Sequence, residues 1–596
     1  MRIPSIRLAT DAALRVWIRF PLVLLSGFLA AGVGIVLAGN RSEPLMAMMA
    51  AATLGLPLFT ALSLASERLV SRAPAIGLAI AGVALLVAFA WLWPTWTEEI
   101  RLRRYAQLSI AFHLTAAFLP YLSGREPNGF WQYNRMLFLR FFSAGVHSAV
   151  LFGGLALALL ALDQLFDVNL PERTYIRLWL LVAFVFNTWF FLGGVPADLP
   201  ALEQRRDYPR ALEVFSQFIL IPLVVIYLAI LTAYLGRVLL TGNWPSNFIG
   251  FPVSIVATFG IFSLLLVYPL RDDESHRWIG RYARWFFLAL LPAVGMLLAA
   301  IWKRIGQYGV TEDRYFLAVL GAWLAAIALL FLARSRTSIR WIPITLCALA
   351  LVTFAGPLGA YSVSRHSQIS RLRSALEANG LFARGEVRPA TGGVPFATRK
   401  EIGNILQYLL QTHGRASLQG LLGTANVALV EDSLSGSGAR SADRTNDVRQ
   451  IMANLGMTYV SPYEGVESRA FYYQRHGAPM RAVSVLDADY HVRLDGSLPA
   501  PFQIAGETWR LDAVPGRLAL ITPRDTVRFP MEELIDFAHA RIGLPDTTEA
   551  TRFTARSDGI TAVLVPNNYS GVGRGDSAQV HMMSADLYLT LPGSHR

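Results

Sequence analysis

Long apolar runs recur through the first 361 residues of the chain. Each is close to the roughly 20 residues that a helix needs to cross the hydrocarbon layer of a membrane. Their residues do not alternate between apolar and polar, so each run predicts a helix and not a strand of a membrane barrel. The predicted spans are 20–39, 45–65, 74–94, 105–122, 140–162, 176–195, 214–236, 249–270, 285–302, 315–333 and 341–361. Residues 1–361 are therefore predicted to form an α-helical multi-pass membrane bundle of about eleven transmembrane helices.

The pattern changes abruptly after residue 361, and short alternating runs predominate, which is typical of half-buried strands. The predicted elements are helices at Ser364–Asn379, Thr398–Gly414 and Met531–Ile542, a flexible loop at Ser435–Asn446, a hairpin turn at Pro515-Gly516, and strands at Ala482–Leu494, Glu507–Ala513, Arg517–Thr522, Thr551–Ala555, Ile560–Val565 and Ala578–Leu591. Residues 362–596 are thus predicted to form a soluble α+β domain, long enough to have its own core.

Composition agrees with an apolar part joined to an ordinary one. The chain is 54% hydrophobic and 16% charged, whereas about 25% charged residues is usual for a globular domain. Nearly all of the net charge of +12 lies in residues 1–361. There it indicates basic loops that orient the helices, and no nucleic-acid partner is expected. Cys347, the one cysteine, lies in an apolar run, so a single chain can form neither a disulfide nor a cysteine-ligated metal site.

Basic residues also predict the orientation of the bundle. Arg2, Arg7, Arg15 and Arg19 precede the first apolar run, which we interpret as an uncleaved span. With the N-terminus in the cytoplasm, the cytoplasmic loops carry more Arg and Lys than the opposite ones, as the positive-inside rule requires. An odd number of spans then places the C-terminal domain on the far side. The span 105–122 decides this, because omitting it would return the domain to the cytoplasm.

Three polar segments carry a resemblance to a known family. They are Asn128-Gly-Phe-Trp-Gln-Tyr-Asn-Arg135, Arg304-Ile-Gly-Gln-Tyr-Gly-Val-Thr-Glu-Asp-Arg-Tyr315 and Ser364-Arg-His-Ser-Gln368. The chain resembles the bacterial multi-pass membrane proteins grouped as domain of unknown function 4153, over nearly its whole length. This resemblance implies the cytoplasmic (inner) membrane of a bacterium, with a periplasmic outer face. It transfers no catalytic or binding residue.

Polar groups at bilayer depth are the first candidates for function, because they are costly there. The candidates in three spans are His113, Tyr121, Arg140, Ser143, His147 and Asn187. They could form a polar seam in which the two histidines exchange protons near neutral pH. The alternative is a set of interhelical hydrogen bonds that only stabilise the bundle. No Asp or Glu lies in mid-span to complete a carboxylate relay.

Charged outer loops offer a second candidate site, which could perform acid–base chemistry or bind a phosphate head group. The residues concerned are Glu98, Glu99, Glu312 and Asp313, with Arg101, Arg103, Arg304 and Arg314. Such loop charges more often anchor the protein in solvent. In the soluble domain, Asp487, Asp489 and His491 share one face of a predicted strand and could begin a metal site, although Arg493 and Asp495 continue that face as a solvated one would.

Two further patterns concern packing and the membrane surface. Residues 5–19 and Trp278–Trp285 interleave Arg with aromatic or aliphatic residues, as helices lying in a lipid head-group layer do. Gly27 and Ala31 are small residues spaced by four, which lets helices approach closely.

These patterns predict an integral membrane protein with a role in envelope-associated interaction, sensing or lipid handling. The lipid bilayer is the expected partner, together with envelope proteins or lipids, and neither a metal, a cofactor nor a catalytic residue is implied. One alternative is a secondary transporter or proton-coupled channel that uses the polar seam. A second is an envelope transferase acting at the outer leaflet, although no enzyme signature is present.

Overall fold

The computed structural model describes residues 6–591 except 41, 70, 124, 243–249, 273, 335–336, 391, 424–440, 461–469, 475–487, 515, 542–551 and 573–578. The chain divides into two compact units. Unit 1 comprises Met1–Pro389 and Ile405–Leu455, and unit 2 comprises Ala390–Asn404 and Gly456–Arg596. The long helix α16 (Phe396–His413) contributes residues to both.

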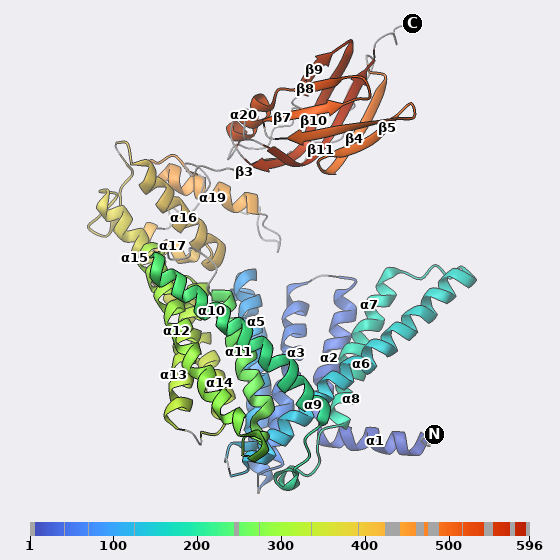
Figure 1. The fold of residues 1–596 in the computed structure, drawn as a ribbon. Coiled ribbons are helices and arrows are strands. Elements are labelled where there is room, and N and C mark those ends of the chain that lie inside the picture. Colours follow the sequence, from blue (N-terminus) through green and yellow to red (C-terminus); the bar gives the residue numbers. More distant parts are fainter. Residues whose placement is uncertain are drawn as a thin grey trace. The chain divides into compact units, whose positions relative to one another are not determined.

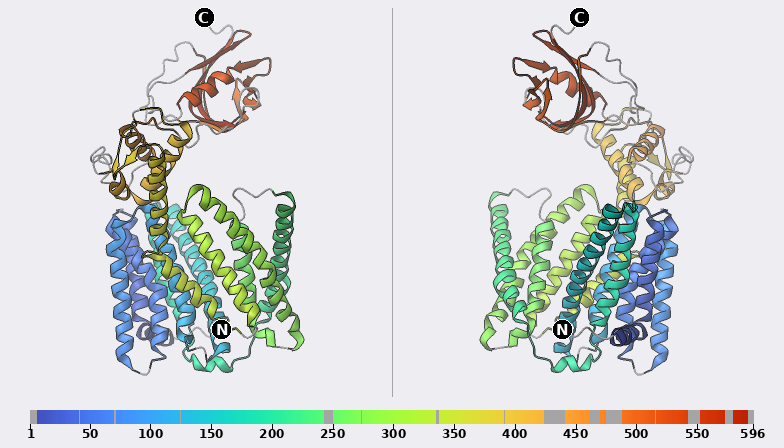
Figure 2. Two further views of the ribbon diagram at one scale, coloured as in Figure 1. Left: turned by 90° about the vertical axis from the view of Figure 1, so that its left-hand side faces the viewer. Right: turned by 90° about the vertical axis from the view of Figure 1, so that its right-hand side faces the viewer.

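Unit 1 is a bundle of long apolar helices (Figure 1). Its helices are α1 (Ile6–Arg19), α2 (Pro21–Leu37), α3 (Glu43–Ser66), α4 (Arg72–Leu92), α5 (Glu98–Phe118), α6 (Pro127–Phe166), α7 (Glu172–Leu181), α8 (Asn187–Gly193), α9 (Arg210–Val214), α10 (Ile221–Thr241), α11 (Gly250–Val267), α12 (Arg277–Tyr308), α13 (Glu312–Ala333) and α14 (Trp341–Phe354). The π-helical segments Val182–Phe186 and Phe215–Leu220 join α7 to α8 and α9 to α10. At one end of the bundle lie α15 (Ala360–Ala378), the C-terminal part of α16, α17 (Ala416–Leu422) and α19 (Ser441–Asn454) (Figure 2).

Each of the eleven predicted spans coincides with a helix, but the helices differ in their capacity to cross a membrane. Among the described residues, eight are long and apolar enough, or up to nine if α1 and α2, bent by 101° at their junction, count as one span. Of the other two, α5 carries Arg101, Arg103 and Arg104 near its start, and α14 has only 14 residues. The predicted last span, 341–361, extended too far because α14 ends at Phe354, before Gly356 at φ +80° and Pro357.

The bend between α1 and α2 fits the predicted amphipathic start of the chain. Leu14 and Ile18 on α1 are 57% and 70% exposed, as apolar side chains of a helix on a lipid surface would be. Arg19 fixes the bend, since its guanidinium donates to both carboxylate oxygens of Glu67 and to the carbonyls of Val195 and Pro196. The end of α1 is therefore tied to the ends of two other helices.

Unit 2 contains two antiparallel sheets that share one hydrophobic core. Its strands are β3 (Ala470–Gln474), β4 (Tyr490–Ser497), β5 (Ala500–Ile504), β6 (Glu507–Val514), β7 (Arg517–Ile521), β8 (Thr526–Phe529), β9 (Phe553–Ser557), β10 (Ile560–Val572) and β11 (Gln579–Thr590), with helix α20 (Met531–Arg541). One sheet has the order β5-β6-β7-β8; the other has β3-β10-β11-β4, with β9 also paired to β10. Alternation buries Trp509, Leu511 and Ala513 of β6 and leaves their neighbours Thr508 and Arg510 exposed.

The α+β prediction for the C-terminal region is confirmed, with local corrections. The short strands β3, β5 and β8 were not predicted from the sequence. The predicted loop Ser435–Asn446 is wrong from Ser441 onward, where α19 begins, and residues 435–440 lie outside the described part of the chain. Val514 of β6 pairs with Arg517 of β7, as the hairpin at this point predicts.

Candidate functional site

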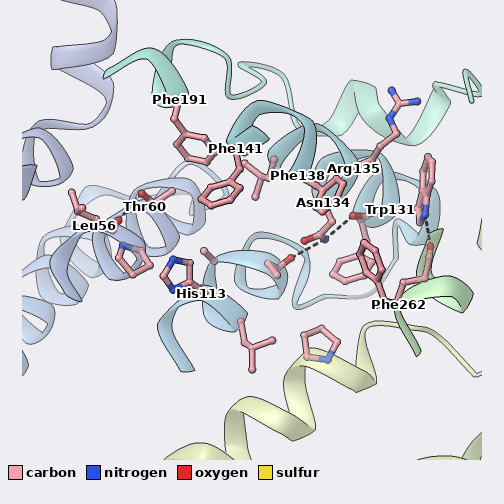
Figure 3. Close-up of a pocket in the computed structure, with 18 of the residues that line it drawn as sticks. Leu56, Thr60, His113, Trp131, Asn134, Arg135, Phe138, Phe141, Phe191 and Phe262 are labelled. Carbon is pink, nitrogen blue, oxygen red and sulfur yellow. Dashed lines mark hydrogen bonds between the residues drawn. The ribbon is translucent and has the colours of Figure 1, made fainter. Parts of the chain in front are cut away.

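A cavity of about 620 Å³ lies among the membrane helices of unit 1 (Figure 3). Its walls come from α2, α3, α5, α6, α8, α9, α11 and α14, and they are mostly Leu, Phe, Ala and Val side chains. Figure 3 shows the aromatic rings of Phe138, Phe141, Phe191 and Phe262 around it. The cavity therefore offers an apolar surface within the part of the bundle that the apolar spans form.

Few polar side chains line this cavity, and most already have partners. Thr60 donates to the carbonyl of Leu56, and the amide nitrogen of Asn134 donates to the carbonyls of Ala117 and Phe130. The Nδ1 atom of His113 lies 2.7 Å from the carbonyl oxygen of Ser109. A carbonyl can only accept, so Nδ1 donates this hydrogen bond, and in the tautomer with its single proton on Nδ1 the Nε2 atom can accept one.

The structure separates the six residues of the predicted polar seam. His113 and Asn187 both line the cavity, and Asn187 accepts a hydrogen bond from Ser148 at 3.1 Å. The other four lie elsewhere: the hydroxyl of Tyr121 donates to the carbonyl of Leu199, Arg140 is exposed, and the His147 ring donates to its own helix at Ser143 and stacks on Phe190 with 4.5 Å between centroids.

One wall of the cavity is built by the first of the three polar segments, 128–135. Asn128 donates its side-chain amide to the carbonyls of Leu202, Glu203 and Arg205, so it fixes the loop that follows α8. Arg135 lines the cavity and pairs with Asp207 of the same loop at 2.7 Å. This hydrogen bond lowers the pKa of the Asp207 carboxyl. The segment therefore holds the loop against α6 and positions the wall.

The other two polar segments, 304–315 and 364–368, pack against each other. Gln368 donates to the carbonyls of Tyr308 (2.9 Å) and Val310 (3.0 Å), and the backbone N–H of Val310 donates to the hydroxyl of Ser367 at 3.0 Å. The side chain of Gln368 is 3% exposed, so these bonds are shielded from water. The segments thus join the α12–α13 turn to α15.

At this junction Glu312 is buried, with 3% exposure. Its carboxylate accepts hydrogen bonds from Ser364 (2.5 Å) and from Tyr408 of α16 (2.6 Å), and Nε2 of His413 lies 3.3 Å away. Burial and the Glu312 charge raise the pKa of Tyr408, so its hydroxyl stays protonated and donates. Ser364 and Glu312 both face Nε2 of His413, whereas a hydrolytic triad uses opposite ring nitrogens for the serine and the acid.

A match to a family model covers most of the bundle and includes the three polar segments. The profile of a domain of unknown function, DUF4153, matches residues 25–383. The chain belongs to the DUF4153 family. It is also 26% identical, over 220 residues, to the uncharacterized protein PM1469 of Pasteurella multocida, a match that covers 37% of either chain. No solved structure matches.

The DUF4153 match covers all three polar segments and the lining of the apolar cavity except Val23, whereas Tyr408, His413 and unit 2 follow it. The chain is a multi-pass integral membrane protein: the apolar helices support this together with the family. The family is described as a domain of unknown function, so the match assigns no chemistry to any residue.

The outer-loop charges predicted as a second candidate site mostly form ion pairs. Arg103 pairs with Glu99 at 3.0 Å and with Asp313, and Arg101 pairs with Glu43 at 2.8 Å. Glu98 is exposed, and Arg314 donates to the carbonyls of Tyr308 and Gly309. Of the predicted carboxylates only Glu312 is buried, and the sequence analysis gave it no separate role.

On β4, His491 pairs with Asp586 of the neighbouring strand at 2.9 Å, and both side chains are partly exposed. The backbone N–H of Leu591 donates to Asp489, and Asp487 lies outside the described residues. Among the residues that are described, no group of three His, Cys, Asp or Glu is placed to hold a metal ion.

Proposed function

We propose that this protein binds a lipid-like molecule inside the bilayer, at the cavity between its membrane helices, and that it has a non-catalytic role in lipid handling. The observation that supports this is an apolar cavity of about 620 Å³ among membrane-spanning helices. Such a cavity is favourable for hydrocarbon groups and unfavourable for ions, because desolvating a charge is costly unless it is paired. An acceptor such as Nε2 of His113 would orient a ligand that carries a hydroxyl group.

The cavity lining favours this proposal over ion-coupled transport. No Asp or Glu is among the described residues that line it, and its Arg135 is already paired with Asp207. Ion and proton pathways in membranes are built from several ionisable side chains such as Asp, Glu or His, whereas the described lining of this cavity has a single histidine, His113. His113 lines the cavity and His147 does not, so the two histidines do not form a continuous path of ionisable side chains through it.

Filling the cavity is expected to reduce lipid binding. Ala117 of α5 lines it, and Ala106 of the same helix is exposed and does not. We expect Ala117→Phe to lower the yield of photo-crosslinking to a lipid with a diazirine on its acyl chain at least severalfold, with Ala106→Phe as the matched control. Mapped crosslinks should concentrate on α5 and α6. Equal yields from the two variants, or crosslinks spread evenly over the lipid-facing surface, would contradict the proposal.

We also propose that the protein lies in the bacterial inner membrane with its N-terminus in the cytoplasm and its C-terminal region in the periplasm. The excess of arginine in alternate loops supports this orientation. A periplasm-dependent reporter fused after Arg596 should be active, and a cytoplasm-dependent reporter at the same position inactive. The reverse result would show that the number of spans is even.

A further inference from the structure

A second pocket, of about 440 Å³, lies at the end of the bundle where α15 and α16 meet α5. It is lined chiefly by polar and basic side chains: Arg104, Tyr361, Ser362, Arg365, His366 and His413. All of them belong to unit 1. The pocket thus differs in chemistry from the apolar cavity, and a ligand could bind here whether or not a lipid binds in that cavity.

Two of the lining side chains hold buried donors without a partner. Tyr361 is only 5% exposed, and its hydroxyl makes no hydrogen bond. The Nε of Arg104 is also buried and unpartnered. The guanidinium of Arg104 lies over aromatic rings, 4.3 Å from the centroid of Trp96 and 5.2 Å from those of Phe354 and Tyr361. Buried donors left without a hydrogen-bond partner destabilise the folded state. A bound ligand that accepts these hydrogen bonds would remove that cost.

The positive charge of the arginines that line the pocket is not balanced by a carboxylate in the described part of the same lining. No carboxylate is among its described lining residues. Of the nearby acids, Glu312 accepts from Ser364 and Tyr408 and lies 3.3 Å from Nε2 of the lining residue His413, whereas Glu99 and Asp313 pair with Arg103, which does not line the pocket. Arg365 and His366 are exposed at the rim, with no ion-pair partner among the described residues. The pocket therefore presents an excess of donors and positive charge.

We propose that this pocket binds a phosphate group, either free or as the head group of a lipid. Arginine suits phosphate because its planar donors match two phosphate oxygens. The rings under Arg104 hold its guanidinium in place, the Tyr361 hydroxyl donates from the buried wall, and Arg365 and His366 close over the anion from the rim. The position at the end of the apolar helices places such a site at head-group depth.

The test measures thermal unfolding of the full chain in a neutral detergent. One arm adds inorganic phosphate against sodium chloride of equal ionic strength. The other adds phosphatidic acid against diacylglycerol with the same acyl chains, so that the two lipids differ only in the phosphate. A ligand that binds the folded state raises Tm by mass action. We expect phosphate, phosphatidic acid or both to raise Tm above the matched additive; the arm that responds identifies the source.

Three variants assign the effect to this pocket. The double variant Arg365→Gln, His366→Gln should weaken binding about tenfold or more, since charge-assisted hydrogen bonds are lost. Tyr361→Phe should weaken binding severalfold without lowering Tm in the absence of ligand, because it removes only an unpartnered hydroxyl. Arg373→Gln, an exposed arginine of the same helix outside the pocket, is the control. The proposal is overturned if neither arm raises Tm, or if the double variant and Tyr361→Phe bind as well as Arg373→Gln.

Discussion

Replacing Glu312 by Ala is expected to lower the free energy of unfolding of unit 1 by about 3–5 kcal/mol, which is the range for breaking a buried charged network. The Glu312 carboxylate is the acceptor for Ser364 and Tyr408 and faces His413. Without it, the half-buried Tyr408 loses the Glu312 acceptor, and the buried hydroxyl of Ser364 keeps only the carbonyl of Tyr361 at 3.3 Å. A buried polar group left unsatisfied costs about 1–3 kcal/mol. Unfolding of the full chain in mixed micelles with increasing denaturing detergent, followed by tryptophan fluorescence, measures the difference.

The neighbouring residue provides the control for this prediction. The side chain of Asp313 is 73% exposed and pairs with Arg103. Exposed pairs contribute little, so Asp313→Ala is expected to change stability by less than about 1 kcal/mol. Glu312→Gln, which keeps one acceptor oxygen, should fall between the two. If Glu312→Ala were no less stable than Asp313→Ala, the buried network would not hold α16 against the α12–α13 turn.

The sequence predicted the helices of the bundle well because the signal is local. An apolar run at bilayer depth has to satisfy its own backbone, so every predicted span became a helix. The last span was predicted too long, because it ran through Gly356 and Pro357 although α14 ends at Phe354. The crossing of the membrane by α5 stays a prediction, since Arg101, Arg103 and Arg104 lie near its start. Strands β3, β5 and β8 were missed, because a short strand is stabilised by its pairing partners, which the alternation of residues along the sequence does not reveal.

The candidate site was harder to predict, because it depends on which helices become neighbours. His113 and Tyr121 were predicted to share one seam, but α5 ends at Phe118, and Tyr121 follows in a 3-10 turn and donates to the carbonyl of Leu199. Asn187 reaches the same cavity as His113 from α8, which no spacing along the chain could reveal. Glu312 was ranked as an ordinary loop charge, since its partner Tyr408 lies 96 residues further along the chain.

The second large effect on stability is expected at Gly27 of α2, where two helical segments pack closely. Its predicted role in letting helices approach agrees with the structure: a Cβ added at Gly27 would lie 2.5 Å from the backbone carbonyl oxygen of Phe184. Phe184 belongs to the π-helical segment between α7 and α8, so the contact cannot be relieved by turning a side chain. We expect Gly27→Ala to lower the free energy of unfolding by about 2–3 kcal/mol, the upper part of the range for overpacking.

Gly32 on the same helix is the matched control, because nothing lies within 4 Å of a Cβ added there. Gly32→Ala gains helix propensity, which is about 1 kcal/mol in a helix interior, and should be neutral or stabilising. The two alanine variants have identical compositions and differ only in position, so the difference between their unfolding free energies isolates the contact with Phe184. Equal stabilities would mean that α2 and the π-helical segment are not in contact, and that the face of α2 that carries Gly27 is directed toward lipid instead.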